Sequence, residues 1–303
     1  MLRSLLLFLS ERRALRRWLE TSPAAAFLTR RFVAGQTLDR EVEVCRHLNS
    51  EGILVSLDHL GENVASDAEA RAALAFYVEA LRRIASENLQ ASVSLKLTQF
   101  GLDLSEDLCR ENTAALLEAA RAHGGFVEFD MEAHPYVDRT LRIVTEMHAR
   151  YGRVRAVAQA YLYRCSEDVE TLCRAGIPIR LCKGAYREPP DIAFPKKTQV
   201  DENYRRLAET LLDRGAYPAL ATHDPKMIQH ALEYVRRNGI AKDRFEFQML
   251  YGIRRDLQRR LAEDGYRLRL YVPYGDAWYP YLMRRLAERP ANLLFLVRNL
   301  FRS

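Results

Sequence analysis

The chain has 303 residues, of which 48% are hydrophobic and 28% are charged, so it can bury the core of one large domain or of two small ones. Its formal net charge of +6 is not concentrated in a stripe with aromatic residues, which argues against a nucleic-acid-binding protein. No run of about 18 apolar residues occurs, so no membrane-spanning helix is expected. The five cysteines show no C-x-x-C spacing, as expected for reduced thiols of a cytoplasmic protein.

Residues 1–45 have a helical pattern, are rich in arginine and are interpreted as an N-terminal helical arm. The apolar run at 5–9 is short, and "ERRALRR" follows where a cleavable signal would have small residues. The segment therefore predicts a basic amphipathic helix. Two alternatives remain open for it: it packs on the body of the protein, or it lies on an anionic bilayer. The second would place the protein at the inner face of the cell membrane.

Residues 46–303 alternate between short β-prone runs and segments of helical periodicity. The β-prone runs lie at 52–57, 92–97, 126–130, 155–162, 177–184, 217–223, 245–250 and 266–273. The helical segments lie at 67–87, 106–123, 136–150, 166–175, 200–214, 225–238, 254–264 and 278–289. Helix starts are expected at Asp67, Ser105, Ser166 and Pro225, which are cap-forming residues or proline.

Strict alternation over about 250 residues predicts the α/β class and, within it, a (βα)8 barrel with an N-terminal helical arm. A doubly wound sheet is the alternative. It would usually show fewer repeats and a G-x-G-x-x-G fingerprint after its first strand, and this fingerprint is absent.

Hydrogen-bonding or charged residues lie at the end of every predicted strand, where barrels of this kind build their active sites. Gln159 is flanked by apolar residues and would cost a few kcal/mol if it were buried unpaired. Lys96 faces the same penalty as a charge, which favours an anionic ligand over a structural role. The ends together predict a charged pocket, and hence an enzyme. No metal site is expected, because no metal-ligand spacing links Asp58, His59, Asp130, His134 and His223.

Arg284 and Arg285 form one of nine Arg-Arg pairs, and their position distinguishes them from the rest. The helical repeat places them on a polar stripe with Tyr281 and Glu288, one turn after the loop of the eighth strand. Guanidinium groups there predict a bidentate site for a carboxylate or a phosphate. Tyr281 would cover the bound group. The apolar face of the same helix is expected to contain Tyr279, Leu282, Met283 and Leu286.

Two other functions are compatible with these residues. Lys96 or Lys183 would serve as the nucleophile of a Schiff-base lyase or aldolase barrel. A non-catalytic basic protein that binds a membrane surface or nucleic acid is the third alternative.

Eight segments resemble the proline dehydrogenase family, in its single-activity bacterial form, over about residues 52–299. They are "LDHLGENV", "SLKLTQFGLD", "VEFDMEAH", "AVAQAYLYR", "RLCKGAYRE", "ATHDP", "EFQMLYG" and "YVPYG…WYPYLMRRLAERPAN". The resemblance implies a distorted (βα)8 barrel with noncovalent FAD. It implies oxidation of L-proline to 1-pyrroline-5-carboxylate by hydride transfer to FAD, the first step of proline degradation to glutamate. It also implies a membrane quinone as electron acceptor and a separate downstream aldehyde dehydrogenase.

The resemblance further implies roles for single residues. Asp130 and Arg180 match catalytic positions. The substrate-binding positions are matched by Lys96, Tyr271, Tyr281, Arg284, Arg285, Leu250, Tyr186, Glu288 and Glu62. The cofactor-binding positions are matched by Met131, Gln159, Arg180, Lys183, Gly184, Ala185, Thr222, His223 and Gln248. Lys96 and the two arginines would hold the proline carboxylate, and Glu62 and Glu288 would pair with those arginines. Tyr274 departs from the family pattern, in which a small apolar residue is found, and is expected to affect the width of the pocket.

Overall fold

The computed structural model describes the backbone of residues 31–288 and the side chains of residues 31–283. Eight strands close into a barrel in chain order, and each strand is parallel to both neighbours. They are β1 (Leu54–His59), β2 (Ala91–Leu95), β3 (Val127–Phe129), β4 (Val154–Gln159), β5 (Ile179–Cys182), β6 (Ala219–Ala221), β7 (Glu246–Leu250) and β8 (Leu268–Tyr274). The predicted barrel is confirmed. β4 and β5 end earlier than expected, because the chain turns after Gln159 and Cys182.

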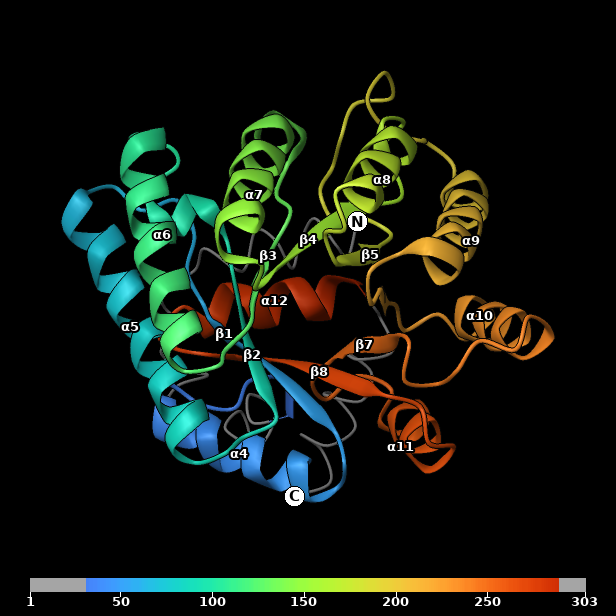
Figure 1. Cartoon of the computed structure of the whole chain (residues 1–303), viewed down its shortest axis with the longest axis horizontal. Coiled ribbons are helices and arrows are strands. Elements are labelled where there is room, and N and C mark those ends of the chain that lie inside the picture. The colour runs from blue at the N-terminus through green and yellow to red at the C-terminus, as the bar shows by residue number, and fades with distance from the viewer. Residues whose placement is uncertain (1–30, 289–303) are drawn as a thin grey trace.

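Helices alternate with the strands along the chain (Figure 1). They are α4 (Leu38–Ser50), α5 (Asp67–Ser86), α6 (Glu106–Ala122), α7 (Val137–Tyr151), α8 (Cys165–Arg174), α9 (Lys197–Arg214), α10 (Pro225–Arg237), α11 (Arg255–Glu263) and α12 (Trp278–Glu288). The expected helix starts at Ser105 and Pro225 are confirmed, since Ser105 accepts from Leu108 N and Pro225 opens α10.

The expected start of α5 at Asp67 is confirmed, and the cap is Ser66, whose hydroxyl accepts a hydrogen bond from Glu69 N. The expected start at Ser166 is wrong. α8 begins at Cys165, so Ser166 lies inside the helix.

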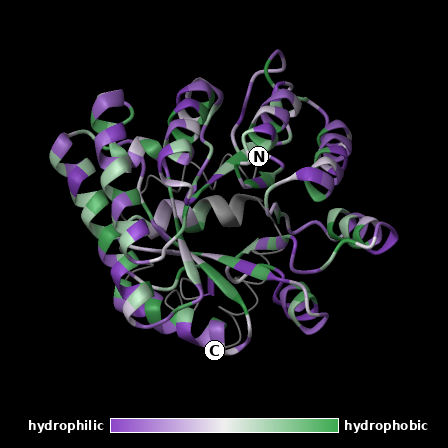
Figure 2. Ribbon diagram, viewed as in Figure 1, coloured by the Kyte–Doolittle hydropathy of each residue, from purple (hydrophilic) through white to green (hydrophobic). Residues whose placement is uncertain are grey.

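Side chains alternate between the two sides of the barrel wall. Along β1, Val55 and Leu57 belong to the large apolar core between the barrel and its helices. Ser56 and Asp58 point the other way, into the barrel, because successive strand residues face opposite sides. The barrel interior is therefore polar, and the apolar core forms a shell around it. The outer helices contain both hydrophilic and hydrophobic residues, as expected for helices with one wet face (Figure 2).

The distortion of the barrel lies in its last helix. α12 does not pack on the outer wall but forms a second apolar cluster with Phe32, Val33, Leu60 and Ile253. Figure 1 shows it lying across the middle of the ring of helices. α4 instead packs outside β1 and β8. The residues before α4 run beside β8, since Ala34 N donates to Pro273 O in β8 and Gly35 O accepts from Gly275 N just after it.

α4 runs across residue 45, where the predicted arm ends and the predicted barrel domain begins. Residues 1–30 of the predicted arm lie outside the described residues. Between residues 31 and 288, no helix is both long enough and apolar enough to cross a membrane.

Candidate active site

A largely buried set of side chains joins four strands, β2, β3, β5 and β8, at the C-terminal end of the barrel. Asp130, directly after β3, accepts a hydrogen bond from Ser94 Oγ at 2.7 Å and one from Tyr271 Oη on β8 at 2.7 Å. It also accepts a hydrogen bond from Nη2 of Arg180 on β5. The guanidinium carbon of Arg180 lies 5.6 Å from the centre of the Tyr271 ring, within cation–π range. The structure thus brings together three of the residues that the sequence singled out.

The pKa values of two carboxyl groups in this region are shifted in opposite directions. Burial acts to raise the pKa of Asp130, but Arg180 and Lys96 overcome this effect and hold that pKa below its usual value. Burial raises the pKa of Asp58 to about 6, although Lys96 acts to lower it. Acids with perturbed pKa values in one polar pocket are characteristic of functional sites.

Lys96 lies among acidic residues at the end of β2. Its Nζ is 3.5 Å from Oε2 of Glu62. Burial acts to lower the pKa of Lys96, but Asp58 and Asp130 outweigh burial and raise it. Lys96 is therefore a mostly buried cation, which suits a carboxylate-binding role. Glu62 was expected to pair with an arginine, and among the described side chains it lies beside this lysine.

Glu132 is a second acid that the sequence did not select. Thr98 donates to it from its backbone N at 3.2 Å and from Oγ1 at 2.8 Å. Burial nevertheless raises the pKa of Glu132 to about 7. The available signal was its position, two residues after Asp130, which itself directly follows β3.

The candidate cofactor-binding residues lie in or just after β3 to β7. Gln159 Nε2 donates to the carbonyl oxygen of Glu132 at 2.9 Å, so the amide is paired rather than orphaned. His223 Nε2 accepts from Leu250 N at 2.8 Å, which places the proton of a neutral ring on Nδ1. Met131 and Thr222 are buried, whereas Ala185 is exposed.

Lys183 and Gly184 follow β5. Hydrogen bonds to two aspartates hold Lys183, and a close approach to Tyr161 requires glycine at position 184. Lys183 Nζ donates to Asp201 Oδ1 at 2.5 Å and to Asp224 Oδ2 at 2.7 Å. Gly184 has a φ of 112°, and a Cβ at this position would lie 2.3 Å from Cδ1 of Tyr161. Only glycine fits there, because the backbone passes directly under the Tyr161 ring.

Apolar and aromatic groups close the C-terminal end of the barrel. Tyr279, Leu282 and Met283 are buried in the second cluster, which confirms that part of the predicted apolar face of α12. Tyr281 is buried in the same cluster, and Leu250 packs against it. Tyr186, on the loop after β5, is 37% exposed. The side chains of Arg284, Arg285, Leu286 and Glu288 lie outside the described residues, so the predicted arginine clamp is not described.

The expectation for Tyr274 is wrong. Its side chain belongs to the apolar core outside the barrel wall, and its ring lies 5.1 Å from that of His59. It does not narrow the barrel interior, because it faces the opposite side from Tyr271, three residues earlier on the same strand.

Four charged side chains fill the barrel below Asp130, and we call them the floor cluster: Glu128, Arg155, Glu246 and Arg269. Arg155 Nη1 lies 3.2 Å from Glu128 Oε2 and 2.7 Å from Glu246 Oε1. Arg269 Nε lies 2.8 Å from Glu246 Oε1. The sequence analysis missed this cluster. Its signal is the placement of charged residues at alternate positions of otherwise apolar strands, as in "FVEFD" and "FEFQML".

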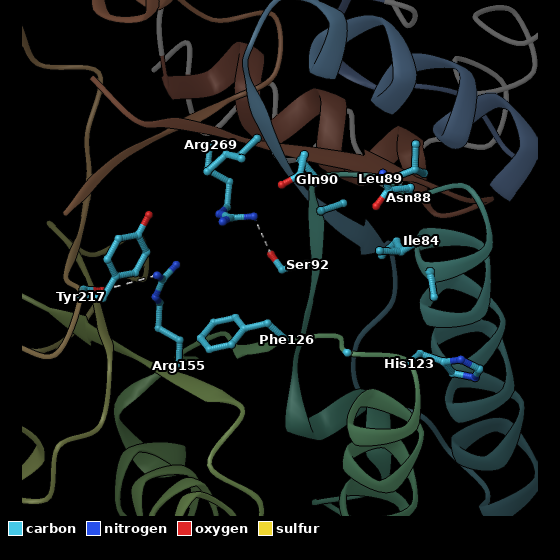
Figure 3. A pocket seen from close by; sticks show the side chains of 14 residues that line it. Ile84, Asn88, Leu89, Gln90, Ser92, His123, Phe126, Arg155, Tyr217 and Arg269 are labelled. Carbon is cyan, nitrogen blue, oxygen red and sulfur yellow. Dashed lines mark hydrogen bonds between the residues drawn. The ribbon is translucent and has the colours of Figure 1, made fainter. Parts of the chain in front are cut away.

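A cavity of about 480 Å³ lies beneath the floor cluster, at the N-terminal ends of the strands (Figure 3). Arg155, Arg269 and Ser92 reach into it, and Arg155 lies between the rings of Phe126 and Tyr217. The two arginines are neutralised by the two glutamates of the floor cluster. In barrels of this kind chemistry belongs to the C-terminal face, so we place the active site at the other end.

The closed parallel barrel, with a cation, an ion pair and aromatic side chains gathered at its C-terminal face, defines the protein as a (βα)8-barrel enzyme. The chain belongs to the proline dehydrogenase family, whose model matches residues 42–298. Membership of this family implies a flavin cofactor. Among residues 31–288 no group of three or more His, Cys, Asp or Glu residues is arranged to hold a metal ion.

Comparison with individual proteins agrees with this assignment. The chain is 42% identical to proline dehydrogenase 2 of Bacillus subtilis (strain 168) over 270 residues, which are 89% of each chain. It is 40% identical to the proline dehydrogenase of Deinococcus radiodurans over 281 residues, 91% of each chain. The solved structure of proline utilization A from Bdellovibrio bacteriovorus, inactivated by N-propargylglycine, is similar with a TM-score of 0.81 and 26% identity. The match covers 87% of this chain and 33% of that one, so this chain spans about a third of the larger protein.

Proposed function

We propose that this protein oxidises L-proline to 1-pyrroline-5-carboxylate with FAD as its cofactor, the first step of proline degradation to glutamate. The observation that supports the proposal most strongly is the family match over residues 42–298, which spans the whole barrel and its C-terminal face. Proline has a carboxylate, and Lys96 is a mostly buried cation at that face. Burial acts to lower the pKa of Lys96, but Asp58 and Asp130 raise it.

The donor set at the ends of β4 to β7 fits a flavin nucleotide. When bound, a flavin accepts the electrons that are released as the C–H bond next to the proline nitrogen is broken. Arg180 provides a buried positive charge, which favours a ring that gains negative charge. Lys183 provides a second cation, and Gly184 lets the backbone pass where a side chain would collide with Tyr161.

The other residues that we assign to the cofactor are Met131, Gln159, Ala185, Thr222, His223 and Gln248.

The substrate side of the site is assigned to a second group of residues. Arg284 and Arg285 on α12 are proposed to clamp the carboxylate together with Lys96, with Glu288 and Glu62 as their acidic partners. Tyr271, Tyr281, Leu250 and Tyr186 are proposed to cover the ring. Asp130 keeps Arg180 and Tyr271 in place, because it accepts a hydrogen bond from each of them. Such a closed arrangement orients the substrate and expels water.

A Schiff-base lyase is the less favoured function. Its lysine must be neutral to attack a carbonyl group. Carboxylates surround Lys96 and hold it charged, and Lys183 donates to both Asp201 and Asp224. These contacts disfavour both lysines as nucleophiles.

Colour tests the proposal directly. The purified protein should be yellow, and anaerobic addition of L-proline should bleach it, whereas D-proline serves as the matched control. A colourless protein that borohydride traps on a carbonyl substrate would instead establish the lyase.

We further propose a membrane quinone as the final electron acceptor and a separate aldehyde dehydrogenase as the enzyme that takes up the product. A protein that meets a membrane quinone must reach the bilayer surface, and the basic residues 1–30 are the segment we propose for this contact. The protein would then work in the cytoplasm and at the inner face of the cell membrane.

A further inference from the structure

Gln248 links the floor cluster to Arg180. Its Nε2 donates one hydrogen bond to Glu128 Oε2 at 2.9 Å and another to Glu246 Oε1 at 2.8 Å. Its Oε1 accepts a hydrogen bond from Arg180 Nη1 at 3.5 Å. A carboxylate can only accept and a guanidinium can only donate, so the amide has a single chemically consistent orientation. Both N–H groups of Gln248 donate to the floor cluster, and only its oxygen faces Arg180.

Glu128 is the residue that imposes this orientation together with Glu246. It is fully buried and accepts a hydrogen bond from Ser92 Oγ at 3.0 Å. Burial acts to raise the pKa of Glu128, but Arg155 and Arg180 overcome burial and lower it, so the side chain is a carboxylate. Its Oε2 lies 3.6 Å from Arg180 Nη1.

Arg180 therefore lies between two carboxylates, that of Glu128 in β3 and that of Asp130 directly after β3. Asp130 binds its Nη2 and Glu128 lies beside its Nη1. The two acids are two residues apart, so both face the barrel interior, with Glu128 one layer deeper. In a buried site, a negative charge this close reduces the positive potential that Arg180 exerts on its surroundings.

We propose that Glu128 is a positioning residue for the flavin site, which fixes Gln248 as a hydrogen-bond acceptor and reduces the positive potential of Arg180 from one layer below. The inference rests on the proposed function, in which Arg180 and Gln248 are assigned to the cofactor. A reduced flavin ring gains negative charge, so it is stabilised by Arg180 and destabilised by Glu128. Glu128 thus makes the bound flavin harder to reduce than Arg180 alone would.

The reduction potential of the bound flavin tests this role. Glu128→Gln keeps the shape of the side chain and removes its charge. Glu128→Asp keeps the charge but withdraws it from Gln248 and Arg180. We expect the potential, measured by anaerobic titration of the holoenzyme against a reference dye, to become more positive in both variants. The shift should be larger for Glu128→Gln.

Glu41→Gln is the matched control. Glu41 is also fully buried, but it lies on α4 outside the barrel wall, and its substitution should leave the potential unchanged. Thermal unfolding of each holoenzyme identifies variants that fail to fold, and Glu128→Asp alone suffices for the test because it leaves the floor cluster charge-balanced.

A potential that is unchanged or more negative in the folded Glu128 variants would overturn the inference and leave the proposed function intact. A wild-type protein that contains no flavin would overturn both.

Discussion

Tyr271 and Asp130 join two strands that are not neighbours in the barrel, since the hydroxyl of Tyr271 on β8 donates to Oδ2 of Asp130 after β3 at 2.7 Å. The two residues are 141 positions apart in the chain. The contact places an aromatic ring beside Arg180 at the face where we place substrate and cofactor.

Asp130→Ala should lower kcat/KM for proline by about 100-fold or more, because Arg180 and Tyr271 lose a shared acceptor and move. Tyr271→Phe keeps the ring and removes only one hydrogen bond to a charged group. It should cost about 1.5 kcal/mol, or about tenfold. Steady-state kinetics and thermal unfolding measure both. Equal kcat/KM for Asp130→Ala and wild type would contradict the assigned role.

Arg284→Met and Arg285→Met should each raise KM for proline by about 10- to 100-fold, the range for one lost charge-assisted hydrogen bond. Flavin content, read from the visible absorbance of the purified variants, should stay at the wild-type level. Tyr281→Phe is expected to have a smaller effect than either. Loss of flavin with an unchanged KM would show that the two arginines bind the cofactor and not proline.

Gly184→Ala should lower both the melting temperature and the flavin content, because its Cβ would meet the Tyr161 ring and its φ of 112° disfavours a side chain. Gly176→Ala is the matched control. Gly176 also has a positive φ, of 69°, but a Cβ there meets nothing within 4 Å. We expect about 1 kcal/mol for Gly176→Ala and several times more for Gly184→Ala. Similar costs would show that the Tyr161 contact is unimportant.

Glu41 should make the stability of the protein depend on pH. Its carboxyl group is fully buried on α4, and neither oxygen has a hydrogen-bond partner within the described part of the chain. Burial and then Asp58 raise the pKa of Glu41 well above 4.5. A raised folded-state pKa means that the folded protein binds the proton more tightly. The stabilising contribution is therefore full below about pH 4.5 and decreases as pH rises toward the folded-state value.

Glu41→Gln should flatten the decline of melting temperature measured from about pH 5 to about pH 9. Glu41→Met should also stabilise the protein by about 1–3 kcal/mol at the alkaline end, because no buried polar group then lacks a partner. Glu43→Gln, an exposed position on the same helix, serves as control and should leave the slope unchanged. A Glu41→Gln slope as steep as that of the wild type would disprove the prediction.

Deletion of residues 1–30 should abolish flotation of the protein with anionic liposomes and leave its melting temperature nearly unchanged. The boundary follows from the structure, because Phe32 and Val33 belong to the apolar cluster of α12 and residues 34–35 hydrogen-bond to β8. A deletion through residue 35 would remove these contacts and confuse loss of folding with loss of binding. Equal flotation of the full and shortened chains would exclude the arm as the membrane contact.

The sequence alone determined the barrel fold and which residues lie at the ends of its strands. In β1, Val55 and Leu57 alternate with Ser56 and Asp58, and this period fixes which side chains face inward. Asp130, Arg180 and Tyr271 could be selected from motifs, because parallel strands bring their carboxyl ends to one face whatever lies between them.

Only the tertiary structure decided which charges meet and where the terminal helices lie. Arg155 meets Glu246 across 91 positions because the closure of the barrel sets how far each strand is offset from its neighbours, which no local pattern encodes. The amphipathic patterns of α4 and α12 predict one buried face each, but such a face fits the outer wall as well as the barrel end. Packing of α12 against Phe32 and Ile253, and of α4 outside β1 and β8, settles the choice, because burial of apolar area has no direction of its own.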